Sequence, residues 1–314
     1  MSRVVRSADG VDVRVRVRLP SHGAVDRTRT VLLAHANGFH GGVFAPLVER
    51  LCGLGYACYA LDFRGHGLSA GGEVGQLSWG RLADDCAAVV TALGLHGCHA
   101  LGHSCGGHAL LMAESRRPGM FASVYAFEPI FVVKPEDVPG LDVSPSSPLM
   151  ASTEYMVRSA SRRRAKFASA REALEAYSSK PPMNTWNVEA LEAYVNDGAF
   201  VPDGDGVRLA CTSETEVAVY QAGDRETEAF GKLKNVLCPV VVAKGTSVAP
   251  DGKSPIYSAV IASAIAAALP NGRLVEFPDN GHLGPMENPR AVADSAHELF
   301  SSVAATAPRS RSKL

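Results

Sequence analysis

Short apolar runs alternate along the chain with segments whose apolar residues recur at helical spacing. Residues 11–19 alternate strictly between apolar and charged side chains, which predicts an antiparallel strand with one solvent-facing side. Further strands are expected at 30–34, 56–61, 98–103, 121–127, 240–243 and 273–277, and helices at 43–54, 78–93, 256–269 and 289–303. Strands that alternate with helices predict an α/β fold with a mostly parallel sheet and right-handed crossovers.

This alternation breaks between residues 129 and 234. Proline and serine crowd residues 135–148, helical stretches are expected at 153–170, 171–178 and 188–196, and Pro202–Gly206 reads as a turn. We therefore predict a core formed by 1–128 and 235–305, a mostly helical insertion at 129–234, and a flexible tail at 306–314. Within the insertion, Arg162, Arg163 and Arg164 are expected on a solvated helix face.

Composition and charge narrow the class of protein. The chain of 314 residues has 31 basic and 32 acidic side chains, a balance that disfavours nucleic acid and strongly charged partners. No apolar run approaches the roughly 20 residues that span a bilayer, and the N-terminus lacks an apolar signal core. Seven cysteines without a C-x-x-C pair indicate reduced thiols in an intracellular compartment.

The chemistry centres on Gly102-His103-Ser104-Cys105-Gly106, a G-x-S-x-G sequence between a predicted strand and a predicted helix. That context is typical of a nucleophile elbow, in which a sharp turn lifts a serine hydroxyl above the sheet edge. Ser104 is therefore the candidate nucleophile. The backbone N–H of Cys105 points toward the same spot and is a candidate oxyanion donor.

A candidate base lies far downstream, in the glycine-flanked loop Asn280-Gly281-His282-Leu283-Gly284 that follows a predicted strand. A histidine at the carboxyl edge of the sheet can reach the elbow and accept the serine proton. His103 and His108 are poor metal ligands, because no carboxylate or cysteine joins them at ligand spacing.

Two further segments complete the pattern: His35-Ala36-Asn37-Gly38 after the strand at 30–34, and Asp62-x-Arg64-Gly65-x-Gly67-x-Ser69 after the strand at 56–61. With these segments the chain resembles the α/β-hydrolase superfamily, in its large group with a helical cap inserted after strand six. The first segment resembles the family's oxyanion loop, although Ala36 stands where glycine is usual. The resemblance implies that Asn37 donates its backbone N–H to the oxyanion.

The resemblance also implies a reaction. Ser104 would form an acyl-serine intermediate, His282 would act as base and then acid, and no metal or organic cofactor is required. The leading hypothesis is a carboxylic-ester hydrolase with a lipid-like or acyl substrate. An acyl-CoA thioesterase, a carbon–carbon bond hydrolase and a non-enzymatic binding protein remain as alternatives.

The acid of the triad is less ordinary. The family usually places it after strand seven, but here that strand runs into Lys244-Gly245-Thr246, and the next carboxylate is Asp251. Glu128 ends strand six instead, as in some family members, and a charged group at the end of an apolar strand needs a partner such as His282. We predict Glu128 as the acid, with Asp251 second and Asp279 third.

The chain ends in Ser312-Lys313-Leu314. S-K-L at a C-terminus is an address read by the peroxisomal import receptor rather than a membrane anchor. We therefore expect the protein in the peroxisome or a related organelle such as a glycosome.

Overall fold

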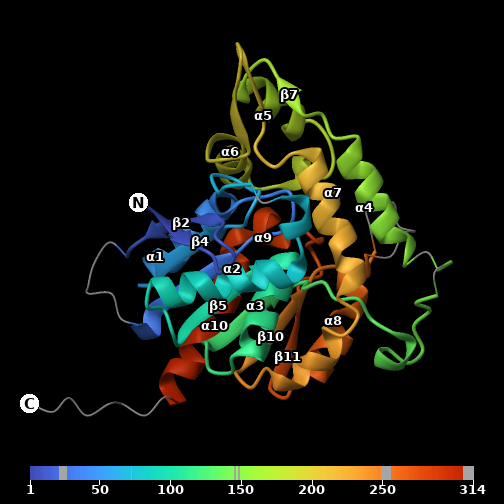
Figure 1. The fold of residues 1–314 in the computed structure, drawn as a ribbon. Helices are drawn as coiled ribbons and strands as arrows, with labels where there is room; N and C mark the ends of the chain where they lie inside the picture. Colours follow the sequence, from blue (N-terminus) through green and yellow to red (C-terminus); the bar gives the residue numbers. More distant parts are fainter. Residues whose placement is uncertain (21–26, 72, 145, 148, 249–255, 307–314) are drawn as a thin grey trace, which may run out of the picture.

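The computed structural model describes residues 1–20, 27–71, 73–144, 146–147, 149–248 and 256–306 (Figure 1). Within these residues an eight-stranded sheet has the order β1-β2-β4-β3-β5-β6-β10-β11. The strands are β1 (Ser2–Arg6), β2 (Asp12–Arg18), β3 (Thr30–Ala34), β4 (Ala57–Asp62), β5 (Cys98–His103), β6 (Phe121–Phe127), β10 (Val240–Lys244) and β11 (Gly272–Glu276). The predicted strands are confirmed, and most of them begin and end within about one residue of the predicted position. The sequence did not predict β1.

The sheet is mostly parallel, as the sequence predicts. β1 and β2 pair antiparallel with each other, β2 pairs antiparallel with β4, and the remaining pairs are parallel. β3 and β5 are buried along their whole length, which explains their continuous apolar runs. In β2 only alternate residues such as Val13 and Val15 are buried, because its other side faces solvent.

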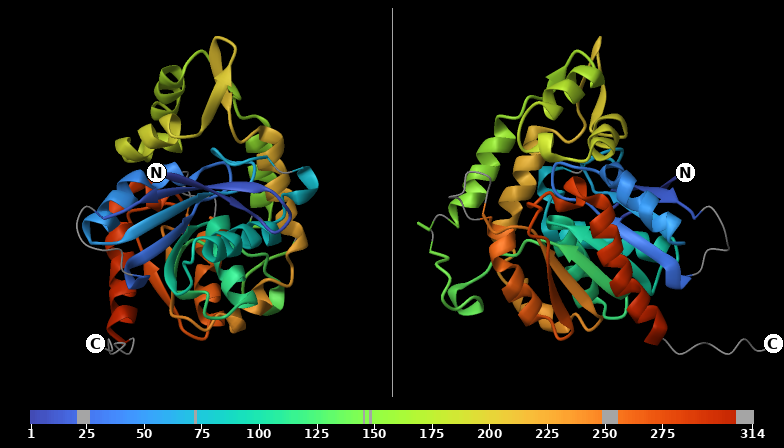
Figure 2. Two further views of the ribbon diagram at one scale, coloured as in Figure 1. Left: turned by 60° about the vertical axis from the view of Figure 1, so that its left-hand side comes forward. Right: turned by 180° about the vertical axis from the view of Figure 1, so that it is seen from behind.

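Helices cover both faces of the sheet (Figures 1 and 2). They are α1 (Ala45–Gly53), α2 (Trp79–Ala92), α3 (Cys105–Arg116), α8 (Tyr257–Ala268), the short α9 (Gly284–Glu287) and α10 (Pro289–Thr306). One apolar cluster joins α2, α3 and α8 to Leu32 and Ala100, and a second joins α1 and α10 to Leu33 and Leu101. Neighbouring strand residues thus enter opposite cores, as the strand period of two requires.

Most of the chain between β6 and β10 forms a cap above one end of the sheet, while the segment just after β6 and Phe230–Asn235 pack beside the core helices (Figure 2). It contains α4 (Ala151–Ser161), α5 (Ala170–Ser178), α6 (Val188–Asn196), α7 (Ser213–Ala222) and a small sheet of β7 (Lys166–Phe167), β9 (Gly206–Leu209) and β8 (Phe200–Asp203). Single 3₁₀ turns occur at Arg27–Arg29, Gly41–Phe44, Val74–Gln76, Pro135–Asp137, Met183–Thr185, Gly223–Arg225 and Phe230–Asn235.

The cap departs from the prediction in three respects. The helix expected over 153–170 ends at Ser161, and the small sheet was not anticipated because β7 has only two residues. The prediction of a solvated arginine face is wrong for Arg163: its side chain is only 16% exposed and forms an ion pair with Glu216, whereas Arg162 and Arg164 are exposed. Within the described residues, the helices are too short or too polar to cross a membrane.

Candidate active site

The elbow at Ser104 is a tight turn between β5 and α3. Ser104 has φ 54° and ψ −119°, and its backbone N–H donates to the carbonyl of Phe127 at 3.0 Å. A Cβ at Gly106 would lie 2.2 Å from the carbonyl oxygen of Ala34, and one at Gly102 would lie 2.6 Å from the backbone of Gly107. Neither position has room for a side chain, which explains both glycines of the G-x-S-x-G sequence.

Glu128 follows the last residue of β6 and has an unusual backbone. Among the described residues, Ser104 and Glu128 are the non-glycine residues with positive φ, and φ of Glu128 is 43°. The Glu128 N–H donates to the carbonyl of Ala243 at 2.7 Å, which fixes this turn against β10. Strained backbone of this kind persists where surrounding contacts enforce it, and it clusters at functional sites.

The carboxylate of Glu128 contacts His282. The His282 Nδ1 lies 2.6 Å from Oε2, and the backbone N–H of Gly245 donates to Oε1 at 2.8 Å. The Glu128 carboxyl is fully buried, and burial raises its pKa. The hydrogen bond and charge of His282, together with the hydrogen bonds from Ser258 and Gly245, lower the pKa more than burial raises it, so the net pKa is below its usual value. The carboxylate therefore stays ionised and holds the Nδ1–H of His282, which leaves Nε2 free to accept a proton.

Ser258, in the first turn of α8, also belongs to this arrangement. Its hydroxyl donates to Glu128 Oε2 at 2.7 Å, and its oxygen lies 3.0 Å from His282 Nδ1. The sequence analysis missed Ser258. Its only signal was a serine at the start of an otherwise apolar helix, which reads equally well as a capping residue.

The two other carboxylates predicted as possible acids are Asp251 and Asp279. Asp279 is exposed and forms no hydrogen bond or ion pair with His282 among the described residues, whereas Asp251 lies outside those residues.

His282 lies beside the elbow, because its carbonyl accepts a hydrogen bond from His103 Nε2 at 2.8 Å. In the described part of the chain the Ser104 hydroxyl has no hydrogen-bond partner, and catalytic hydrogen bonds are often unformed in an unliganded site.

Asn37 and Cys105 are neighbours in the structure. Cys105 is the first residue of α3, where backbone N–H groups have no acceptor within the helix. The backbone N–H of Asn37 faces the Cys105 thiol, so the two candidate oxyanion donors are neighbours. Burial raises the pKa of the Cys105 thiol to about 12, so Cys105 stays protonated and does not compete with Ser104 as nucleophile.

Comparison with known proteins agrees with this geometry. A model of the alpha/beta hydrolase family matches residues 31–295, which include the elbow, the cap and the histidine loop. The chain belongs to the alpha/beta hydrolase family. The predicted α/β-hydrolase fold is thereby confirmed.

Individual relatives are more distant. A Mycobacterium tuberculosis protein named as a non-heme bromoperoxidase, BpoC, is 28% identical over 267 residues, which cover 82% of this chain and 88% of BpoC. Human monoglyceride lipase is 30% identical over 111 residues, 34% of this chain and 36% of the lipase. The crystal structure of the peroxisomal alpha-beta-hydrolase Lpx1 from Saccharomyces cerevisiae covers 99% of this chain and 90% of its own, with a TM-score of 0.73 at 17% identity.

The segment after β4 braces this alpha/beta hydrolase beneath the site. Asp62 accepts hydrogen bonds from the backbone N–H groups of Gly41 (2.7 Å) and Leu68 (2.9 Å). Arg64 is fully buried and paired with Asp9 and Asp85. In the part of the chain that the structure describes, Asp62 and Arg64 contact none of Ser104, Glu128 and His282, so the D-x-R-G-x-G-x-S sequence has a structural role, joining Gly41, the β1–β2 turn and α2.

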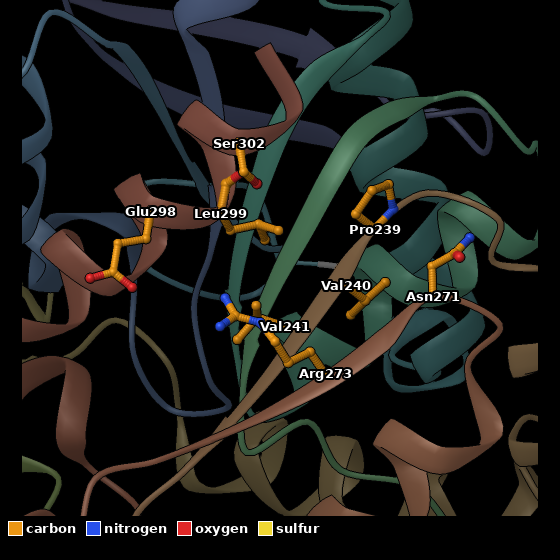
Figure 3. A pocket seen from close by; sticks show the side chains of 8 residues that line it. All are labelled: Pro239, Val240, Val241, Asn271, Arg273, Glu298, Leu299 and Ser302. Atoms are coloured by element: carbon orange, nitrogen blue, oxygen red, sulfur yellow. The ribbon is translucent and has the colours of Figure 1, made fainter. Parts of the chain in front are cut away.

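Other features of the hydrolase lie away from Ser104. A pocket of about 440 Å³, lined by Val240, Asn271, Arg273 and Glu298 among others, opens at the amino ends of β10 and β11 (Figure 3). Glu128 and Gly245 lie at the opposite, carboxyl edge of the sheet, so this pocket is separate from the site. The described residues contain no cluster of three or more His, Cys, Asp and Glu that would hold a metal ion.

Proposed function

We propose that this protein is a serine hydrolase in which Ser104 is the nucleophile, His282 the base and Glu128 the acid of the triad. The observation that carries the proposal is the 2.6 Å contact between His282 Nδ1 and the buried Glu128 carboxylate, next to the strained elbow. Three segments far apart in the sequence supply one nucleophile, one base and one group that orients the base.

The proposed reaction has two halves. Ser104 Oγ attacks the substrate carbonyl carbon while His282 Nε2 takes the hydroxyl proton, and the carbonyl electron pair moves onto oxygen. Collapse of this tetrahedral intermediate breaks the bond to the leaving alcohol, which receives the proton from His282. Water then attacks the acyl-serine with His282 again as base, releasing the carboxylic acid and restoring Ser104.

Glu128 stabilises the imidazolium that forms in each half-reaction, and the backbone N–H groups of Asn37 and Cys105 stabilise the oxyanion. Such donors are worth about 10²–10³ in kcat each in serine hydrolases. The scheme requires no metal ion or organic cofactor.

We propose a carboxylic ester with a lipid-like or acyl portion as the substrate. A serine nucleophile suits acyl transfer, and the partial match to a monoglyceride lipase supports an ester of this kind. Acyl-CoA thioesters and carbon–carbon bonds next to a carbonyl are cleaved by the same intermediate and are therefore the competing outcomes of the test.

The test is a panel of p-nitrophenyl and glycerol esters of increasing acyl length, assayed beside the matching CoA thioesters and a β-diketone. We expect ester hydrolysis with the highest kcat/KM, and labelling of wild-type protein by a fluorophosphonate probe. A preference for thioester or diketone would replace the substrate class, whereas absence of both turnover and labelling would overturn the enzyme assignment.

We also propose import into peroxisomes through Ser312, Lys313 and Leu314, which lie outside the described residues. The motif itself supports the proposal, as does the name of the structural neighbour Lpx1, which describes a peroxisomal hydrolase.

A further inference from the structure

The oxyanion loop is bound to the cap through the side chain of Asn37. Its Nδ2 donates to the backbone carbonyl of Glu216 in α7 at 2.8 Å, and its Oδ1 lies 3.1 Å from His66 Nε2 on the core side. Asn37 and Glu216 are both 8% exposed. Asn37, the residue proposed as the second oxyanion donor, is thus held between core and cap.

The next residue, Gly38, is enclosed by the cap as well. Its carbonyl accepts a hydrogen bond from the hydroxyl of Tyr194 in α6 at 3.4 Å. Gly38 has φ +77°, and a Cβ here would lie 2.8 Å from the Glu216 carboxylate and 3.2 Å from Arg163 Nη1. The loop can adopt this conformation only because position 38 is glycine, and the cap then closes over it.

Arg163 links these contacts. Its Nη1 donates to Glu216 Oε2 at 2.9 Å, and its Nη2 donates to the hydroxyl oxygen of Tyr194. Arg163 lies between α4 and β7, Tyr194 lies in α6 and Glu216 in α7, so three parts of the cap meet at this guanidinium. A largely buried arginine is costly unless it is paired and hydrogen-bonded, and here two of its nitrogens have partners.

We propose that Arg163, Glu216 and Tyr194 form a positioning cluster that holds the Asn37 backbone N–H in the oxyanion hole, so that the seating of the cap sets the efficiency of the chemical step. The inference rests on the proposed serine-hydrolase function. An oxyanion donor works because its orientation is fixed before charge develops. In this molecule the first donor, Cys105, is fixed by the helix α3, whereas the second donor depends on the cap.

The proposal predicts which kinetic constant changes. Loss of the cluster lets the Asn37 peptide reorient, which weakens binding of the tetrahedral oxyanion more than binding of the substrate. We expect Arg163→Met to lower kcat about 10- to 100-fold with KM changed less than about threefold, since the removal of one oxyanion donor outright costs about 10²–10³.

The experiment compares Arg163→Met and Tyr194→Phe with Arg164→Met. Arg164 is a matched control, because it also lies in the cap and pairs with a glutamate, Glu172, but is exposed and remote from Gly38. Each variant is assayed for kcat and KM with the best ester, for affinity to an alkyl boronic acid, whose Ser104 adduct places an oxygen in the oxyanion hole, and for thermal unfolding.

The proposal is supported if Arg163→Met and Tyr194→Phe both lose kcat and boronic-acid affinity by similar factors while Arg164→Met retains both. Wild-type kcat and boronic-acid affinity in Arg163→Met, or an effect on KM alone, overturns it. If Arg163→Met does not fold, Tyr194→Phe decides, because it removes only the hydroxyl. Wild-type protein that neither hydrolyses esters nor binds the boronic acid would instead refute the proposed function.

Discussion

The two sides of the site are built by different parts of the molecule. Ser104 and Glu128 follow neighbouring strands of the core, and their strained backbones are held by strand-to-strand hydrogen bonds to Phe127 and Ala243. Asn37 also follows a core strand, but its side chain and the next carbonyl are held by Glu216 and Tyr194 of the cap.

The two sides of the site therefore differ in which part of the molecule holds their residues in place. The proposed nucleophile and acid are fixed by the sheet and by the close-packed glycines of the elbow. Asn37, the proposed second oxyanion donor, is held by contacts to α6 and α7 of the cap. Loss of the nucleophile or the acid on the core side should therefore abolish the reaction, whereas changes in the cap side should only reduce its rate.

The largest effect is expected for Ser104→Ala on the core side. Loss of the hydroxyl removes the acyl intermediate, and kcat should fall about 10³-fold or more. Little packing is lost with one oxygen, so the thermal unfolding temperature should stay near that of the wild type. Substantial turnover by the purified variant, with contaminating esterases excluded by active-site labelling, would contradict the assignment of the nucleophile.

Glu128→Gln tests the residue that follows β6, the second strand end on the core side. The amide cannot hold the imidazolium by charge, and we expect kcat to fall about 10²- to 10⁴-fold. Asp251→Asn and Asp279→Asn are the matched controls and should change kcat less than about threefold. A large loss in Asp251→Asn with a small one in Glu128→Gln would move the acid to the segment after β10.

Ser258→Ala tests a supporting hydrogen bond on the core side of the site. The hydroxyl donates to the same Glu128 oxygen that His282 contacts, and loss of one hydrogen bond to a charged group should lower kcat about 10-fold. Ser263→Ala, an exposed serine on the same helix, is the control. Equal kcat in the two variants would mean that Ser258 only fills space.

Acid should destabilise the folded core. Burial lowers the pKa of His108 in α3 to about 3 and that of His99 in β5 to about 4, against about 6.5 in an unfolded chain. Between about pH 6.5 and pH 4 the unfolded state therefore binds more protons, and stability present at neutral pH is lost as pH falls. Each histidine should lower the free energy of unfolding by about 2 kcal/mol at pH 5.

Urea unfolding at pH 7.5 and pH 5.0 measures this loss, and His108→Gln should reduce the difference between the two values. An unchanged difference in His108→Gln would show that His108 titrates normally.

The smallest effect on catalysis is expected from deletion of Ser312–Leu314. The variant should keep the wild-type kcat and KM while a tagged copy moves from peroxisomes to the cytosol. A tagged deletion variant that remains in peroxisomes would refute the simple import mechanism.

Local patterns were enough to predict the core. The strands of the sheet, the helices that cover it and the turn at Ser104 could be located because strand period, helix period and glycine positions are properties of short segments. Glu128 could be named for a related reason, since a carboxylate at the end of an apolar strand needs a partner and His282 follows a strand end at the same edge of the sheet.

The tertiary structure alone decided the rest. Ser258 reaches Glu128 because α8 begins there, and nothing in its neighbours along the chain indicates this contact. Arg163 appeared to be one of three solvated arginines, yet it is largely buried because α4 ends before it and Glu216 and Tyr194, from two other helices, bond to it. Contacts between residues 20 to 180 positions apart depend on how elements pack, and a single sequence carries no local signal for that.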